Sequence, residues 1–167
     1  KDIWTIKDWE KKKKLEGALW VTTCTEQNFT HLSNISPSTN INLVYHGIDF
    51  NLFPIRKILE KNNKYLERES PVIILSVGRL VEKKGFDILL KSLSLLPKEL
   101  NWKLEHIGNG PLNYKIKKLA DKLNLSNKIN WNGTLTQDKI LNFYKESDIF
   151  VLACKVTQSG DRDGIPN

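Results

Sequence analysis

The sequence predicts an α/β fold in which helices cover both faces of a parallel β-sheet. Strand-like and helix-like segments alternate regularly from Val72 to Ala153. Each segment between successive strands carries one apolar stripe at helical spacing, as the right-handed crossovers of a parallel sheet require. Glycine and polar residues follow the strands, at the edge where ligands bind in such sheets. These observations favour a ligand site at the carboxyl edge of the sheet.

The N-terminal part of the chain predicts a shorter set of helices and strands. A helix rich in Lys and Glu is expected over residues 7–18, followed by a strand over 18–24. Thr25 precedes a helical pattern over 26–35, where its hydroxyl can accept a hydrogen bond from a first-turn amide. The turn-rich cluster SPSTN then leads into a strand over 41–45.

The second half predicts the main sheet. Apolar runs bounded by turn residues predict strands over 72–77, 102–108, 128–133 and 148–153. Helices are expected over 85–96, 111–123 and 136–147. Pro111 suits the first turn of the second of these helices, and Thr136 suits the cap of the third.

Apolar spacing predicts which side chains form the core. The helical residues expected to face inward are Phe86, Leu89, Leu90, Leu93, Leu112, Ile116, Leu119, Ala120, Leu123, Ile140, Leu141 and Tyr144. Trp102 and Trp131 lie in predicted strands and are expected to pack there. His106, inside a strand, is expected to be packed rather than catalytic. Cys154 is expected to be a buried, reduced thiol, because Cys24 and Cys154 match no metal or redox spacing.

Composition restricts the class of protein. The 167 residues suffice for one domain with a core, or for one domain and a piece of another. A content of 40% apolar and 27% charged residues is ordinary for a globular protein. No stretch approaches the roughly 18 apolar residues that span a bilayer. The net charge of +7 favours anionic partners. The lysine run 11–14 follows Trp4 and Trp9, which leaves two readings open: a solvated helix face, or a helix that touches acidic lipid.

The loop VGRLVEKKG, Val77–Gly85, carries the most specific chemistry. Arg79 offers a planar fork of donors for phosphate oxygens, and Lys84 offers a point charge. Gly85 opens a helix, whose first amides favour an anion. The loop is neither a dinucleotide-binding fingerprint nor a phosphate loop of the NTPase kind. It predicts a diphosphate site, unless Arg79 instead pairs with a carboxylate such as Glu82.

Four segments then carry a family resemblance. GRLVEKKGFDILLKSL, IGNGPL, NGTLTQDKILNFYKESDIFVLA and DGIPN occur in this order between Pro71 and Asn167. Together they closely resemble the nucleotide-sugar lobe of the retaining GT-B glycosyltransferases of family four, which carries the glycosyl transferases group 1 signature. ALWVTTCTEQNFTHL and YHGID resemble the end of the acceptor lobe and the entry into this lobe. The resemblance implies a Rossmann-like parallel sheet that is truncated at its C-terminal end.

The same resemblance implies a domain plan. Residues 1–45 would be the end of the N-terminal acceptor lobe, 46–70 the connection between lobes, and 71–167 an incomplete nucleotide-sugar-binding lobe. The chain begins at Lys1 and contains 0 Met, so we expect a fragment or a processed piece. We expect this piece to be inactive alone, because GT-B enzymes react in the cleft between two lobes.

Site residues follow from the resemblance position by position. Arg79 and Lys84 match the family's cations that hold the donor diphosphate and assist catalysis. Asp163 stands where the family usually has the first Glu of a Glu-x7-Glu motif, beside the transferred sugar. The Asp163 side chain is shorter by one methylene than the usual Glu. The remaining matches are Gly164, Ile165 and Pro166 near the sugar and phosphate, and Gly108, Asn109, Gly110, Thr134 and Leu135 around the nucleotide base.

The resemblance implies a glycosyltransferase that moves a sugar from a nucleoside diphosphate sugar to a hydroxyl acceptor with retention. The expected role is in cell-surface polysaccharide or glycolipid synthesis, with a sugar or lipid-linked acceptor. No obligatory metal is implied, and no metal-binding DxD triplet precedes the last loop. A cytoplasmic location is expected, with peripheral contact at the inner membrane face left open. The alternatives are a nucleotide-sugar epimerase of GT-B fold and a non-catalytic anion-binding module; a nucleic-acid partner is not expected, because no aromatic-interleaved basic patch is present.

Overall fold

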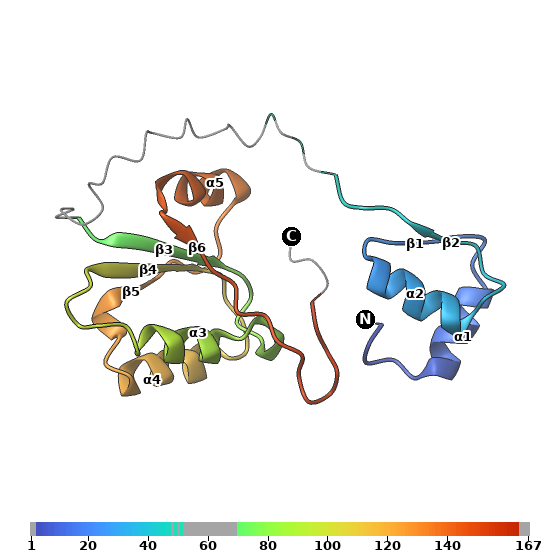
Figure 1. The fold of residues 1–167 in the computed structure, drawn as a ribbon, viewed down its shortest axis with the longest axis horizontal. Helices are drawn as coiled ribbons and strands as arrows, with labels where there is room; N and C mark the ends of the chain where they lie inside the picture. The colour runs from blue at the N-terminus through green and yellow to red at the C-terminus, as the bar shows by residue number, and fades with distance from the viewer. Residues whose placement is uncertain (1–2, 48, 50, 52–69, 164–167) are drawn as a thin grey trace. The chain divides into compact units, whose positions relative to one another are not determined.

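The computed structural model describes residues 3–47, 49, 51 and 70–163 (Figure 1). The chain forms two compact units, one of residues 1–50 with 156–167 and one of residues 51–155. Most of the predicted connection over 46–70 lies outside the described residues. Residues 156–163 cluster with the first unit, although the sequence assigns them to the second lobe, and the domain plan stays a prediction.

The first unit contains two helices and a pair of parallel strands. Its elements are α1 (Asp8–Glu16), β1 (Val21–Thr23), α2 (Glu26–Ile35) and β2 (Ile41–Leu43). Val21 lies opposite Ile41 in the parallel ladder. The Thr25 hydroxyl accepts a hydrogen bond from the Asn28 amide at 3.2 Å, which confirms the predicted cap. The strand predicted over 18–24 is too long, because Leu19 is 95% exposed and lies outside the ladder.

The lysine run belongs to α1 and is largely paired. Lys11 is only 6% exposed, and its Nζ lies 2.8 Å from Asp8 Oδ1 and 3.0 Å from His31 Nε2. Lys14 Nζ lies 2.7 Å from Glu10 Oε1, and Lys12 Nζ lies 3.8 Å from Glu16 Oε1. The pairs of Lys12 and Lys14 join neighbouring turns of one helix and favour the solvated-helix reading for these two residues over contact with lipid, whereas Lys11 is buried against α2.

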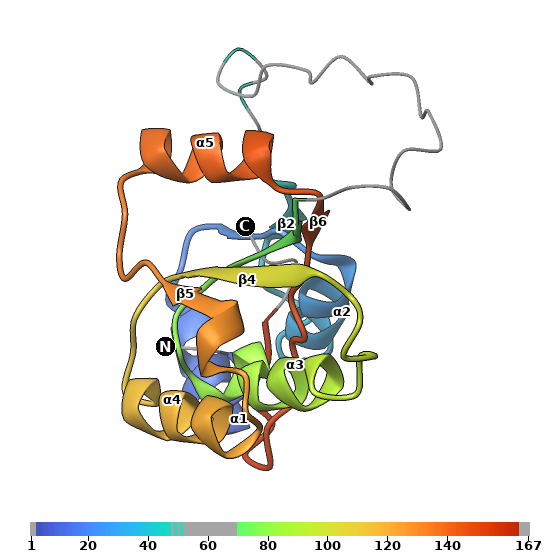
Figure 2. The same ribbon diagram turned by 90° about the vertical axis from the view of Figure 1, so that its left-hand side faces the viewer.

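The second unit is a parallel sheet with strand order β5-β4-β3-β6. Its elements are β3 (Val72–Val77), η2 (Glu82–Lys84), α3 (Phe86–Leu93), β4 (Trp102–Ile107), α4 (Asn113–Lys122), η3 (Ser126–Lys128), β5 (Ile129–Trp131), α5 (Gln137–Glu146) and β6 (Ile149–Phe150). Helices α3 and α4 cover one face of the sheet and α5 covers the other (Figures 1 and 2). The predicted α/β class and the parallel sheet are confirmed.

The last strand is shorter than the predicted 148–153. Ile149 and Phe150 pair with Ile74 and Leu75 of β3. Beyond them, Val151 still donates its amide to the Leu75 carbonyl at 2.9 Å. The Val151 carbonyl, however, accepts from the Ser76 hydroxyl at 2.7 Å instead of from a strand amide. A side chain thus replaces the backbone partner, and the ladder ends.

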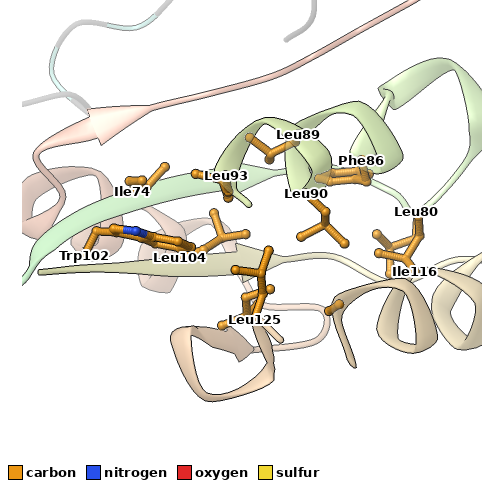
Figure 3. Packing of buried hydrophobic residues seen from close by; sticks show 12 residues of the cluster. Ile74, Leu80, Phe86, Leu89, Leu90, Leu93, Trp102, Leu104, Ile116 and Leu125 are labelled. Carbon is orange, nitrogen blue, oxygen red and sulfur yellow. The ribbon is translucent and has the colours of Figure 1, made fainter. Parts of the chain in front are cut away.

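The core lies between the sheet and the α3–α4 layer. Figure 3 shows Leu89, Leu90 and Leu93 of α3 gathered with Ile74 and Leu104 of the strands. The predicted stripes of α3 and α4 belong to this core or pack against it, as do Trp102 and Trp131.

Two side chains differ from expectation. Tyr144 of α5 is 41% exposed instead of facing inward, because its ring lies at the sheet edge, 5.3 Å from the ring of Phe150. Cys154 is exposed, not buried, because it follows the end of the ladder on a surface segment.

Candidate functional site

The loop after β3 is shaped by a glycine that no other residue can replace without strain. Glu82–Lys84 form a single 3-10 turn, and Gly85 then takes a left-handed conformation with φ 63° before α3 begins. A Cβ at Gly85 would lie 1.8 Å from the Ala153 carbonyl oxygen, so the segment after β6 passes directly against this turn. The Lys155 amide also donates to the Lys83 carbonyl at 2.8 Å. The segment after β6 therefore packs against the loop after β3 and holds its backbone in place.

The two predicted phosphate-binding cations share the carboxyl end of β3. Arg79 is exposed and follows Gly78 directly. Lys84 folds back toward the strand, since its Cδ and Cε would lie 3.6 Å from a Cβ built on Gly78. The bare Gly78 backbone thus leaves room for the Lys84 stem. The loop that leads from β3 to α3 therefore carries an exposed Arg79 and a half-buried Lys84, which directly precedes Gly85 and the start of α3.

The loops after β3, β4 and β5 are joined at the same edge. The Gly78 amide donates to the Ile107 carbonyl at 2.9 Å, and the Gly108 amide donates to the Gly133 carbonyl at 2.7 Å. The Leu80 amide donates to the Asn109 carbonyl at 3.1 Å. These bonds continue the parallel ladder into the loops, so the predicted base-region residues are held next to the cation loop.

Close backbone approach explains two of the predicted base-region glycines. A Cβ on Gly108 would lie 2.0 Å from the Gly78 carbonyl oxygen, and one on Gly110 would lie 2.6 Å from the Leu80 carbonyl oxygen. The Asn109 side chain accepts a hydrogen bond from the Gly110 amide at 2.8 Å. The GNGP turn therefore has a structural reason, and its contact with a base stays a prediction.

Thr134 and Leu135 lie in the loop between β5 and α5. Thr134 is exposed and Leu135 is half-buried. They follow Gly133, whose φ is 66° and whose Cβ position is open. The structure therefore brings this loop, Gly108–Gly110 and the cation loop to one edge, as expected for loops that follow the strands of a parallel sheet.

Asp163 belongs to the first unit and is half-buried. The neighbouring Arg162 guanidinium lies 3.8 Å from the Trp4 ring centroid, and that ring stacks on His31 at 4.5 Å. The grouping of Asp163 with the cations of the second unit stays a prediction. Gly164, Ile165 and Pro166 lie outside the described residues.

An ion pair that the sequence did not indicate links α3 to the segment after β6. Lys155 Nζ lies 3.0 Å from both carboxylate oxygens of Asp87. Burial acts to raise the pKa of Asp87, but the hydrogen bonds and charge of Lys155 outweigh it and lower that pKa. No sequence signal could have found this pair, because 68 positions separate its members.

A buried histidine lies beneath the same edge. His106 is 1% exposed, and its ring meets Phe86 at 4.6 Å and Trp131 at 5.4 Å between centroids. Neither ring nitrogen has a hydrogen-bond partner of good geometry among the described residues, although backbone groups of Gly108 and Ser76 lie near the ring. Burial lowers the pKa of His106 to about 4, so the imidazole is neutral at pH 7. The expectation of a packed histidine is confirmed.

Two further features are absent from the described residues, a cluster of metal-ligating side chains and a membrane-spanning helix. Within 3–47, 49, 51 and 70–163, no three side chains of His, Cys, Asp or Glu gather as a metal site would require. None of the helices described there is both long and apolar enough to cross a bilayer.

Comparisons with known proteins identify the family of the chain. The family model for glycosyl transferases group 1 matches residues 57–164. An amylovoran biosynthesis glycosyltransferase of Erwinia amylovora is 31% identical over 134 residues, which cover 78% of this chain and 30% of that protein. A GDP-mannose-dependent phosphatidylinositol monomannoside mannosyltransferase of Mycobacterium tuberculosis is 24% identical over 151 residues, covering 87% and 38%.

A solved structure shares the fold. The Anabaena protein HepE in complex with UDP and glucose superposes with a TM-score of 0.68 and 15% identity, covering 89% of this chain and 42% of that one. The chain spans about 30% of the length of the first curated relative. Because the family model covers well over half of the chain and includes the loop of Arg79 and Lys84, this chain belongs to the glycosyl transferases group 1 family.

Proposed function

We propose that the protein containing this chain transfers a sugar from a nucleoside diphosphate sugar to a hydroxyl acceptor, with retention at the anomeric carbon. The observation that carries the proposal is the pair of cations at the carboxyl end of β3, beside the start of α3, in a group 1 chain. We further propose a role in cell-surface polysaccharide or glycolipid synthesis, a sugar or lipid-linked acceptor, and a cytoplasmic location, with peripheral contact at the inner membrane face left open.

The chemistry needs positive charge where the diphosphate leaves. As the bond to the sugar breaks, negative charge grows on the phosphate oxygens. Arg79 would offer parallel N–H donors to these oxygens, and Lys84 would add a point charge. The first amides of α3 would favour the same anion. In this proposal the two cations do the work that a divalent ion does elsewhere, so no metal is obligatory.

The names of similar proteins support a nucleotide donor and leave its base open. The mycobacterial relative is named as GDP-mannose-dependent, whereas the Anabaena structure contains UDP and glucose. The Erwinia relative is named for amylovoran biosynthesis, which supports the polysaccharide role. We therefore propose a uridine or guanosine diphosphate sugar as donor, with Gly108, Asn109, Gly110, Thr134 and Leu135 near its base.

Calorimetry with UDP and GDP tests the diphosphate site. Replacing Arg79 and Lys84 by Ala should remove most of the affinity, because hydrogen bonds to charged groups contribute roughly 1.5–3 kcal/mol each. The matched control replaces Lys98 and Lys103, which are exposed elsewhere on the same unit, and alters the net charge equally. Unchanged binding in the Arg79 and Lys84 variant, or an equal loss in the control, would refute the assignment.

Turnover in the full-length protein tests the role of Asp163. Asp163→Asn should lower turnover about a hundredfold and change donor affinity little, because the carboxylate is proposed to act at the reacting sugar. Asp161→Asn is the control, since its backbone carbonyl, which accepts from the Thr157 amide at 2.9 Å, is retained. Turnover near wild type in Asp163→Asn would exclude the proposed role. Product analysis without acceptor would reveal an epimerase.

A further inference from the structure

A basic groove runs along the outer side of the α3–α4 layer, within the second unit. Its volume is about 520 Å³, and Leu112, Ile116 and Leu119 of the α4 segment contribute an apolar part of its lining. Glu82 lines it too, so part of the groove borders the loop that carries Arg79 and Lys84. The groove is thus a separate surface next to the proposed donor site.

The charge of the groove is strongly asymmetric. Its lining includes Lys91, Lys115, Lys118, Lys122 and Lys155, against the carboxylates of Glu82 and Asp87. Asp87 is already paired with Lys155 at 3.0 Å. Within residues 70–163, no carboxylate lies at ion-pair distance from the other four lysines. The groove therefore presents unneutralised positive charge.

The lysines of α4 repeat along one side of the groove. Lys115, Lys118 and Lys122 recur at helical spacing on one face. With a rise of about 1.5 Å per residue, they spread positive charge over about 10 Å of the helix axis. Such a row complements a chain that carries negative groups at intervals, as an acidic polymer does.

An exposed aromatic ring stands at the start of this row. Tyr114 is 78% exposed and lines the groove, and Lys118 Nζ lies 5.8 Å from its ring centroid. An exposed ring offers an apolar surface that can pack on the C–H face of a sugar, with a cation near enough to meet an acidic substituent.

We infer that this groove binds an acidic glycan chain, with uronate or similar anionic groups meeting the α4 lysines and a sugar ring meeting Tyr114. A membrane surface fits less well, because an interfacial helix needs large apolar side chains on its outer face and the lysines here line a hollow. Single-stranded nucleic acid fits less well, because successive bases need several stacking rings and the lining includes one. The choice of a glycan over other polyanions rests on the proposed function.

Fluorescence polarisation with labelled oligogalacturonate and the full-length protein tests the inference. The test variant is Lys115→Gln/Lys118→Gln/Lys122→Gln, in which glutamine keeps a high helix propensity. Its matched control is Lys98→Gln/Lys139→Gln/Lys145→Gln, which removes the same charge from exposed positions that do not line the groove. We expect binding about tenfold weaker in the test variant and nearly unchanged in the control, since each exposed charge pair contributes modestly. Neutral maltohexaose should not bind.

Tyr114→Ala separates glycan binding from simple charge attraction. It should weaken oligogalacturonate binding and leave the binding of inorganic polyphosphate unchanged. The inference is overturned if oligogalacturonate binds no better than maltohexaose, or if both triple variants lose affinity equally. It is also overturned if phosphatidylglycerol vesicles or oligothymidylate compete for the same lysines with higher affinity. No donor or turnover enters the assay, so its failure is distinct from failure of the proposed transferase activity.

Discussion

At the residue scale, Gly85 and Gly133 have the same left-handed backbone conformation, but the space around their Cβ positions differs. Gly85 has φ 63° and a Cβ position 1.8 Å from the Ala153 carbonyl oxygen, whereas Gly133 has φ 66° and an open Cβ position. A substitution at Gly133 causes only backbone strain, because a side chain there would contact no neighbouring atom. At Gly85 a side chain also meets a carbonyl that the sheet and the segment after β6 hold in place. Comparing substitutions at the two glycines therefore distinguishes the effect of backbone strain, which acts at both, from that of steric overlap, which acts only at Gly85.

We predict that Gly85→Ala destabilises the chain by roughly 3 kcal/mol or more, because strain and overlap add. Gly133→Ala should cost only about 1 kcal/mol, the strain of a left-handed alanine. Urea unfolding of both variants measures the difference. Equal losses of unfolding free energy would show that the segment after β6 yields easily and does not support the cation loop.

His106 is the second residue-scale case, and it predicts a pH dependence. Its pKa is near 6.5 in the unfolded chain and about 4 in the folded one, so below pH 6.5 the unfolded state binds more protons. Unfolding free energy should therefore fall as pH drops from 6.5 toward 4. A complete shift corresponds to a loss on the order of 3 kcal/mol.

Replacing His106 by Phe should remove this part of the pH dependence while keeping a ring between Phe86 and Trp131. The measurement is unfolding free energy against pH in both proteins. Burial also lowers the pKa of His31, which remains in the variant and contributes in the same direction. If the two profiles stay parallel between pH 4 and 6.5, His106 is not the titrating group.

At the scale of elements, two threonines precede helices, but the side chain of only one of them accepts a hydrogen bond from an amide of the first helical turn. The Thr25 hydroxyl accepts from the Asn28 amide, whereas Thr136 at the start of α5 makes no capping hydrogen bond with its side chain. The Thr136 side chain instead lies near Asp138, and this interaction is the main cause that lowers the pKa of that carboxyl. Equivalent sequence positions thus have different partners.

Thr25→Ala should destabilise α2 by about 1 kcal/mol, and Thr25→Ser should restore most of that. Thr136→Ala should destabilise α5 by only a few tenths of the free energy expected for Thr25→Ala, because no helix amide loses its hydrogen-bond partner there. Amide hydrogen exchange resolves the two helices separately, with the Asn28 amide as the local probe. Equal acceleration of exchange in α2 and α5 would contradict the assignment of the cap.

At the scale of the whole molecule, the described sheet ends in a short apolar strand. β6 is the last strand in the order, and Ile149 and Phe150 are 48% and 46% exposed. An edge strand with apolar side chains invites pairing with another chain. The isolated 167-residue chain is therefore expected to associate with itself.

Phe150→Lys should reduce this association, because charge on an edge strand opposes pairing between chains. Leu95→Lys is the control, since Leu95 is 85% exposed but lies between α3 and β4. Sedimentation velocity over a range of concentrations gives the mass of each protein. A wild-type monomer at every concentration, or an equal effect of both substitutions, would rule out β6 as the associating surface.

The sequence by itself determined the strands β3 and β4, the apolar stripe of α3 and the position of the cation loop, because local residue patterns are sufficient to predict these features. These features depend on side-chain periodicity and on glycines within a few residues, so the chain carries them in short segments. For the same reason the sequence placed Arg79 and Lys84 at a strand exit, and the structure agrees.

Other features arise only when distant segments meet. The Lys155–Asp87 pair and the Ser76 hydroxyl bond that ends β6 join residues 68 and 75 positions apart. The close approach of Gly108 to Gly78 requires β3 and β4 to lie side by side. The basic groove likewise combines lysines of α3, α4 and the segment after β6. Periodicity within a segment cannot specify such contacts, because their partners are chosen by the order of strands in the sheet.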